Sequence, residues 1–250
     1  MSFIVAGRLD NLPSDIRAQL GSFRHKVFVQ RLHWDIPGVS HNATSEWDEF
    51  DGGETVHLVA LSTENVMCGC ARLMPTTGPY LLRDVFPGLA EQGDSPQSSP
   101  SIWEMSRFAS SGLSDYRTDS TAGMSLFPYA IALARSFGAT RVIGVVSRSV
   151  ARLYRRFGLD LHDMGNGTGS SRTSIVACSI ELDAATFNRL GGDPVTLLGG
   201  IALFGQLVRP QSGTPAQSHP VEAAAASARA TDTVPLAPFD GETAHMRATV

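Results

Sequence analysis

A carboxylate and a guanidinium lie three residues apart in a stretch that otherwise has the character of a buried strand. Residues 102–109 read IWEMSRFA, so Glu104 and Arg107 stand among bulky apolar side chains. Burying either charge alone is costly, and one interpretation is a structural ion pair with other buried charges. The other is a carboxylate at the floor of a site, where Glu104 accepts a proton from a substrate.

The spacing of these two residues adds a structural condition. Side chains three positions apart on a regular strand point to opposite faces of the sheet. If Glu104 and Arg107 serve one site, a β-bulge or a strong local twist must therefore lie there. In a regular strand Arg107 would face away and be structural.

A second charged cluster lies upstream, in the segment EWDEFD at residues 46–51. Such a run of carboxylates is often only a solvated loop. Here the aromatic ring between Asp48 and Asp51 favours a loop that folds back onto the protein. Folded down, this loop would bring both carboxylates close to Arg24. Arg72, in an otherwise apolar strand, needs a partner or an anionic ligand.

An aromatic residue on a loop is a further candidate. The segment RLHWDIPG at residues 31–38 ends in a Pro–Gly pair that stops regular structure, which leaves Trp34 on a loop. Both a ligand contact and a packing anchor are consistent with that position. Phe28 lies four residues after Arg24 and therefore on the same stripe of the preceding helix.

Alternating helices and strands must position these candidates. The apolar patterns predict helices over 14–30, 81–86, 126–137 and from 148 onwards, and strands over 55–61, 66–74, 102–109, 141–147 and 173–183. This order predicts an α/β fold with a mixed β-sheet flanked by helices. It is compatible with the sandwich of the GCN5-related N-acyltransferases, although a fold alone does not give a function.

Length and composition limit the domain organisation and the possible classes of protein. The chain has 250 residues, 42% of them hydrophobic, and a formal net charge of −4. These values predict one domain over 1–208 and an Ala-, Pro- and Ser-rich disordered tail over 209–250, and they give no support to nucleic-acid binding. We expect neither a membrane span nor a secretory signal. The cysteines indicate reduced thiols and a cytoplasmic protein, and the scattered histidines predict no metal site.

Taken together, these residues resemble the acyl-homoserine-lactone synthases, the autoinducer synthases of bacterial quorum sensing. The matching pieces stand in the family's order and at its spacing over roughly residues 3–190, whereas the tail after about residue 208 is not part of the pattern. The pieces are RHKVF at 24–28, Trp34, EWDEFD at 46–51, GCARL at 69–73, Phe86 and WEMSRF at 103–108.

The resemblance implies an acyltransferase with two substrates and no cofactor. S-adenosyl-L-methionine gives its amino-acid portion, and the acyl chain arrives as a thioester on acyl carrier protein. The α-amine attacks the thioester, and the carboxylate then closes the lactone and releases methylthioadenosine. Glu104 would act as general base, directly or through a water. Asp48 and Asp51 would favour the cationic sulfonium, and Arg24 and Arg107 would bind the substrate carboxylate or hold the acidic loop.

The resemblance also assigns the remaining candidates. Trp34 and Phe28 would pack on the adenine or the sulfonium, with a cation–π energy of about 1 kcal/mol. Arg72 would complete the charge network and Phe86 would shape the site. We expect a monomer.

The acyl pocket should lie between the sheet and the helices, where each candidate is equally a plain core residue: Met105, Met124, Leu126, Phe127, Val145, Val146 and Leu153. Some family members that prefer 3-oxo chains carry a threonine on the strand that matches 141–147. Ser147 follows two valines here, so we expect a medium-length chain without a 3-oxo group. The next helix carries four arginines on one face, usually a solvated surface but here a candidate dock for the acidic carrier protein: Arg148, Arg152, Arg155 and Arg156.

Two other functions compete with this interpretation. A general N-acetyltransferase of the GCN5-related kind would carry a glycine-rich, pyrophosphate-binding turn that opens a helix. The stretch ASSGLSD at 109–115 lacks that pattern. A non-catalytic sensor of S-adenosylmethionine or an acyl ligand is the other alternative, but a protein that only binds has no need of a base such as Glu104.

Overall fold

In the computed structural model, residues 3–90, 98–111, 124–165, 175–207 and 246–248 are described. The strands are β1 Phe3–Gly7, β2 Val56–Leu61, β3 Met67–Pro75, β4 Ile102–Ser111, β5 Arg141–Ser147, β6 His162–Asp163, β7 Ile175–Glu181, β8 Ile201–Phe204 and β9 Met246–Ala248. The α-helices are α1 Ser14–Arg24, α2 Leu81–Asp84, α3 Phe127–Ser136, α4 Arg148–Arg156, α5 Ala184–Arg189 and α6 Pro194–Gly199. A π-helix, η2 His25–Arg31, continues α1, and short 3-10 helices span Leu9–Asn11, Glu49–Asp51 (η3) and Pro87–Leu89.

The strands form one mixed sheet in the order β6-β7-β5-β4-β3-β2-β1-β8, with β9 paired to β4. Neighbours from β1 to β4 are antiparallel, whereas β4 and β5 are parallel. The β4–β5 register covers only residues 102–104 against 141–143, so the two strands separate beyond Glu104. The predicted mixed sheet flanked by helices is confirmed.

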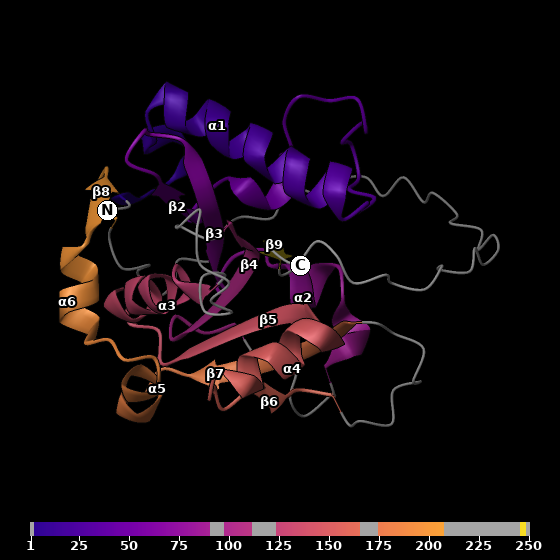
Figure 1. Cartoon of the computed structure of the whole chain (residues 1–250). Helices are drawn as coiled ribbons and strands as arrows, with labels where there is room; N and C mark the ends of the chain where they lie inside the picture. Colours follow the sequence, from indigo (N-terminus) through magenta and orange to yellow (C-terminus); the bar gives the residue numbers. More distant parts are fainter. Residues whose placement is uncertain (1–2, 91–97, 112–123, 166–174, 208–245, 249–250) are drawn as a thin grey trace.

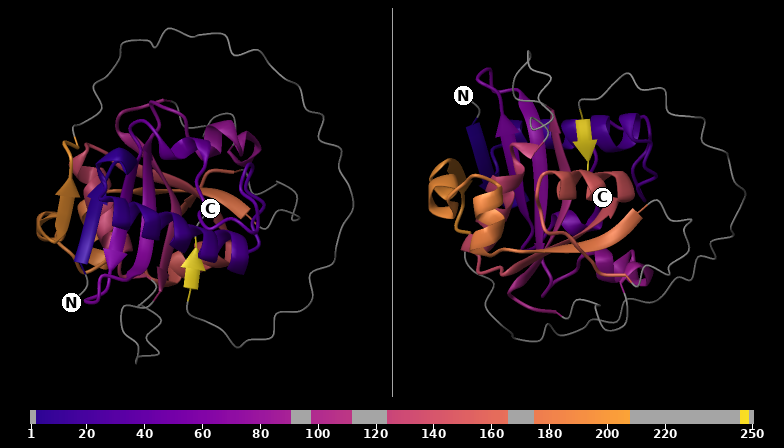
Figure 2. Two further views of the ribbon diagram at one scale, coloured as in Figure 1. Left: turned by 90° about the horizontal axis from the view of Figure 1, so that it is seen from above. Right: turned by 60° about the horizontal axis from the view of Figure 1, so that its bottom comes forward.

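Helices cover both faces of this sheet (Figure 1), with α1 on one side and α3 and α4 on the other. Seen from above, α1 crosses the strands of the N-terminal half (Figure 2). Strand alternation sends side chains to both layers: on β5, Val142 and Val146 join the core under α3, whereas Ile143 and Val145 join a core with α2.

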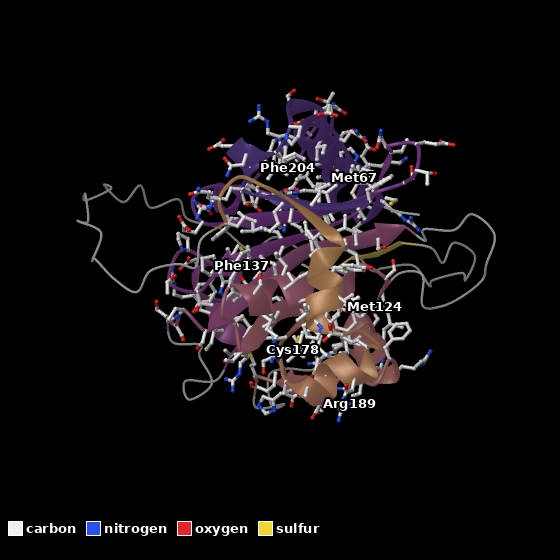
Figure 3. All side chains as sticks on the ribbon, turned by 90° about the vertical axis from the view of Figure 1, so that its left-hand side faces the viewer. Met67, Met124, Phe137, Cys178, Arg189 and Phe204 are labelled. Carbon is white, nitrogen blue, oxygen red and sulfur yellow. The ribbon has the colours of Figure 1, made fainter. Side chains whose placement is uncertain are left out.

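The two layers are also visible from the side (Figure 3). Met67 and Phe204 lie on the α1 side of the sheet, and Phe137, Met124 and Cys178 lie on the α3 side. On the α1 side the apolar packing divides into one core beneath α1 and η2 and a second around α2.

The predicted irregularity in β4 is present. Its register with β3 shifts between Cys70 and Arg72, and Arg107 has a φ of 49°, in the left-handed region. Trp103 and Met105 face the α3 core and so does Phe108, which breaks the alternation at residue 107. This β-bulge turns Arg107 onto the face that carries Arg72.

The predicted tail, residues 209–250, lies almost entirely outside the described residues. From that segment β9 is described, and it pairs antiparallel with residues 109–111 of β4. None of the helices in the described ranges is long and apolar enough to cross a membrane.

Candidate active site

The acidic loop is held against α1 by close backbone contact. The Glu46 amide donates to the Gly21 carbonyl at 3.0 Å. A Cβ added at Gly21 would lie 2.7 Å from the Trp47 ring, so only glycine allows this approach. The guanidinium carbon of Arg24 in turn lies over the Trp47 ring, 5.1 Å from the ring centroid. The docked loop places the carboxylates of η3 over the sheet.

Three arginines and three carboxylates then form one network, buried except for the partly exposed Asp48: Arg24, Arg72, Arg107, Glu46, Asp48 and Asp51. Arg24 makes a two-pronged pair with Asp51, at 2.6 and 3.0 Å, and a further bond to Glu46. Arg72 donates to Asp51 at 3.0 Å and also to Asp48. Each arginine bridges two carboxylates, so the network crosslinks α1, the loop, β3 and β4.

Arg107 completes the network from the bulge of β4. Its Nη2 lies 3.1 Å from Glu46 Oε1 and 2.7 Å from Asp48 Oδ2. Its guanidinium also lies over two aromatic rings, 5.4 Å from the centroid of Phe28 and 5.6 Å from that of Trp34. Those rings stack on each other at 4.7 Å. The π-helix and the following loop therefore place an aromatic pair against a buried cation.

Burial and pairing act on the pKa values of this network in opposite directions. Burial alone would raise the pKa of Asp51, but the neighbouring Arg24 and Arg72 hold it well below its usual range. His57 is buried beside the network, 3.9 Å from an Asp51 oxygen, and burial lowers its pKa to about 4. At neutral pH the carboxylate is therefore ionised and the histidine is neutral.

Glu104 is held differently. Its carboxylate accepts the backbone N–H groups of Leu81 and Leu82, at 2.6 and 2.9 Å, and so caps the start of α2. Burial raises its pKa to about 7, although these two bonds and the charge of Arg72 act to lower it. A carboxylate with that pKa can both accept and release a proton near neutral pH.

A cavity of about 580 Å³ opens beside the network. Its lining residues are Trp34, Asp35, Ile36, Pro37, Asp48, Glu49, Phe50, Leu81, Val85, Phe86, Arg107 and Ile175. Aromatic and apolar side chains form most of this wall, with Arg107 and the carboxylates as its charged groups. Leu81 links the cavity to Glu104, because it lines the wall and its amide donates to that carboxylate.

The structure separates the predicted site residues into two groups. Trp34, Phe86, Asp48 and Arg107 line the cavity. The others lie behind it: Arg24, Arg72 and Asp51 in the network, Phe28 beneath Trp34, and Glu104 behind Leu81. Nη2 of Arg72 is buried without a hydrogen-bond partner among the described residues, which makes it a costly free donor.

The predicted acyl-pocket residues are not all brought together. Met105, Met124, Phe127 and Val146 are buried in the core under α3. Val145 faces the opposite side of the sheet, in the core with α2, because successive residues of β5 alternate between faces. The four arginines proposed as a docking face, Arg148, Arg152, Arg155 and Arg156, are exposed on α4, where Arg155 pairs with Asp163 at 2.7 Å.

Sequence reasoning did not assign Glu46, although it lies in the same acidic segment and is fully buried between Arg24 and Arg107. It also passed over Asp35 and Glu49, which line the cavity. A charge count would have indicated one further carboxylate of the segment 46–51, because three buried arginines need three carboxylates, but not which one.

Comparisons with known proteins identify the family of this chain. The autoinducer synthase family model matches residues 11–190. The chain is 40% identical over 183 residues to the acyl-homoserine-lactone synthase of Ralstonia solanacearum, an alignment that covers 72% of this chain and 89% of that protein. It is 36% identical over 176 residues to the enzyme of Pseudomonas aeruginosa, with 70% and 84% covered. The chain therefore belongs to the autoinducer synthase family and is an enzyme.

Solved structures of the same class share the fold. The chain superposes on TofI in a ternary complex with an inhibitor and MTA with a TM-score of 0.64 and 34% identity, covering 77% of this chain and 98% of that one. BjaI, a CoA-dependent acyl-homoserine lactone synthase solved with SAM and isopentyl-CoA, gives a TM-score of 0.67 at 24% identity, with 82% and 95% covered. The latter likeness concerns the fold alone.

Proposed function

We propose that this enzyme makes an N-acyl-homoserine lactone from S-adenosyl-L-methionine and an acyl thioester carried by acyl carrier protein. The α-amine attacks the thioester carbonyl, a new amide bond forms, and the carrier thiol leaves. The carboxylate then attacks the carbon bound to sulfur, closing the lactone and releasing methylthioadenosine. The two substrates balance the reaction, so no metal or redox cofactor is needed.

The observation that carries this proposal is the arrangement of the cavity. One wall holds the stacked Trp34 over the cation of Arg107, and another holds Leu81, whose amide binds Glu104. An adenosine ring would pack on the aromatic wall, and Arg107 would receive the substrate carboxylate. TofI, whose structure contains MTA, supports an adenosine thioether as a ligand of this enzyme.

Glu104 takes the role of general base in this proposal. The α-amine of the substrate is protonated at neutral pH and must lose a proton before it attacks. Glu104 has a pKa of about 7, so a large fraction of it is ionised and ready to accept that proton, directly or through a water. Arg24, Arg72 and Asp51 touch each other and hold the loop, and we assign them a positioning role.

The choice of carrier protein as acyl donor rests on α4. Arg152 and Arg156 are exposed on this helix, and an acidic partner would be attracted by such a basic face. Coenzyme A is the competing donor, since BjaI is described as CoA-dependent. The medium-length chain without a 3-oxo group remains part of the proposal.

The test mixes purified protein with S-adenosylmethionine and a panel of acyl-carrier-protein and acyl-CoA thioesters, and follows lactone and methylthioadenosine by mass spectrometry. We expect both products only when both substrates are present, with carrier thioesters used at the higher kcat/KM. Arg152→Gln/Arg156→Gln should raise KM for the carrier thioester several-fold. The matched control, Arg17→Gln on exposed α1 surface, should not. A preference for CoA thioesters would overturn the carrier assignment, and consumption of acetyl-CoA with an unrelated amine would overturn the synthase.

A further inference from the structure

The buried network cannot by itself attract a cation, because its charges cancel. Its three arginines are matched by three carboxylates, and each carboxylate is in contact with two guanidinium groups. The adjacent His57 is neutral at physiological pH, because burial lowers its pKa to about 4. Asp48 and Asp51, which the sequence suggested as the groups that favour a sulfonium, are thus already neutralised by arginine.

Two other carboxylates line the same cavity. Asp35 lies on the loop after η2, next to Trp34, and Glu49 begins η3, next to Asp48. Both side chains are exposed, and within the described part of the chain neither takes part in an ion pair. The loop and η3 are separate segments, so these two charges reach the cavity independently. They add to its wall two carboxylates that no ion pair among the described residues neutralises.

We propose that Asp35 and Glu49 select the cationic sulfonium substrate over the neutral thioether product. This inference rests on the proposed function. S-adenosylmethionine carries one positive charge more than its thioether analogue, and the lactone-forming step removes that charge when the carbon–sulfur bond breaks. Attraction to Asp35 and Glu49 therefore acts on the substrate and disappears in methylthioadenosine. The same pair that favours substrate entry no longer retains the product after turnover.

The size of this effect follows from the exposure of the two side chains. Charges in contact with solvent interact through a high effective dielectric and are screened by salt. Exposed charge pairs accordingly contribute little each. We expect about a threefold loss of substrate affinity for either single neutralisation and about tenfold for both.

The experiment measures binding of three ligands by calorimetry to the full-length protein and to Asp35→Asn, Glu49→Gln and the double variant. The ligands are S-adenosylmethionine, its neutral thioether analogue S-adenosylhomocysteine, and methylthioadenosine. We expect the double variant to bind the first about tenfold more weakly and the other two unchanged. Raising the salt concentration should weaken binding of the sulfonium to the wild type and have little effect on the double variant.

Two controls separate the possible failures. Glu64→Gln removes an exposed carboxylate from the β2–β3 turn, far along the chain from both cavity segments, and should change none of the three affinities. Asp35→Glu/Glu49→Asp retains both charges and should restore selectivity. If all three ligands weaken equally in the double variant, or none does, the charge-selection inference is wrong. If none of the three binds the folded wild type, the proposed function itself fails.

Discussion

On one side of the cavity Asp51 meets the guanidinium groups of Arg24 and Arg72, and behind the other Glu104 meets two backbone N–H groups of α2. Both carboxylates are buried, yet their pKa values move apart: that of Asp51 falls well below its usual range, and that of Glu104 rises to about 7. Full opposite charges fix a buried carboxylate in its ionised form, whereas backbone dipoles offset only part of the cost of burial.

This difference separates a structural role for Asp51 from a chemical role for Glu104 within one site. A carboxylate that stays ionised throughout the neutral range can hold two arginines but cannot exchange a proton during turnover. A carboxylate with a pKa near 7 can do so. The comparison predicts that changes on the Asp51 side act mainly on stability and changes at Glu104 mainly on rate.

Asp51→Asn should have the largest effect. It leaves Arg24 and Arg72 buried with one carboxylate fewer, and removal of one partner of a buried ion network typically costs about 3–5 kcal/mol. We expect the free energy of unfolding in urea to fall by that amount. Glu181→Gln breaks the exposed pair with Arg141 and should cost less than about 1 kcal/mol. Equal losses for the two variants would contradict a structural network.

Glu104→Gln should reverse this pattern. The amide oxygen still accepts an N–H from α2, so the fold should remain, but the side chain no longer accepts a proton. General bases typically contribute about 10²–10⁴-fold, and we expect kcat to fall by about a thousandfold while S-adenosylmethionine still binds. Asp84→Asn, which removes a carboxylate from the end of the same short helix, serves as the control and should keep most of the rate. A Glu104→Gln enzyme with full turnover would remove the base assignment.

The sequence was sufficient where local patterns are strong. The continuous apolar run at 141–147 predicted β5 with its observed bounds. The bulge followed from the condition that Glu104 and Arg107, three residues apart on a strand, serve one site. The order of helices and strands was enough for the mixed sheet. In each case the signal lies within a few neighbouring residues.

Features that depend on distant partners were missed. β1 and β8 are short strands that pair with each other across most of the chain, with β8 at the edge of the sheet. The sequence analysis also did not use Asp183 and Asp193, which cap the starts of α5 and α6. Glu46 faces inward because Trp47 packs on Gly21. Glu104 is held by backbone amides, and a pattern of side chains in the sequence cannot predict such a contact. Val145 was placed with Val146 although strand alternation separates them.

The two carboxylates should also give opposite pH dependences of stability. The folded pKa of Glu104, about 7, lies above its ordinary value, so its contribution is present below about pH 4.5 and is lost as pH rises through 7. The stability that Glu104 loses over this pH range is about 3 kcal/mol. Asp51 has a lowered pKa, so its contribution is present above pH 4 and is lost in more acidic solution.

His57 complicates the wild-type curve, because its lowered pKa makes the fold more stable as pH rises from about 4 to 6.5. Subtracting the curve of Glu104→Gln removes that contribution. We expect the wild type to lose stability relative to the variant between pH 4.5 and 7, measured by urea unfolding. A difference that does not change over this range would place the pKa of Glu104 at its ordinary value.

Trp34→Leu should have the smallest effect, because Trp34 contacts the arginine–carboxylate network only through Arg107. Trp34 is half-buried and lines the cavity, and its ring lies over Arg107 and stacks on Phe28. Leucine keeps an apolar contact but loses the ring face, and lost stacking with the adenine costs about 1 kcal/mol of ligand interaction. We expect affinity for methylthioadenosine, measured by calorimetry, to fall about fivefold while the unfolding curve barely moves. If stability fell as far as in Asp51→Asn with ligand affinity unchanged, Trp34 would be a packing anchor of the arginine network and not a wall of the substrate site.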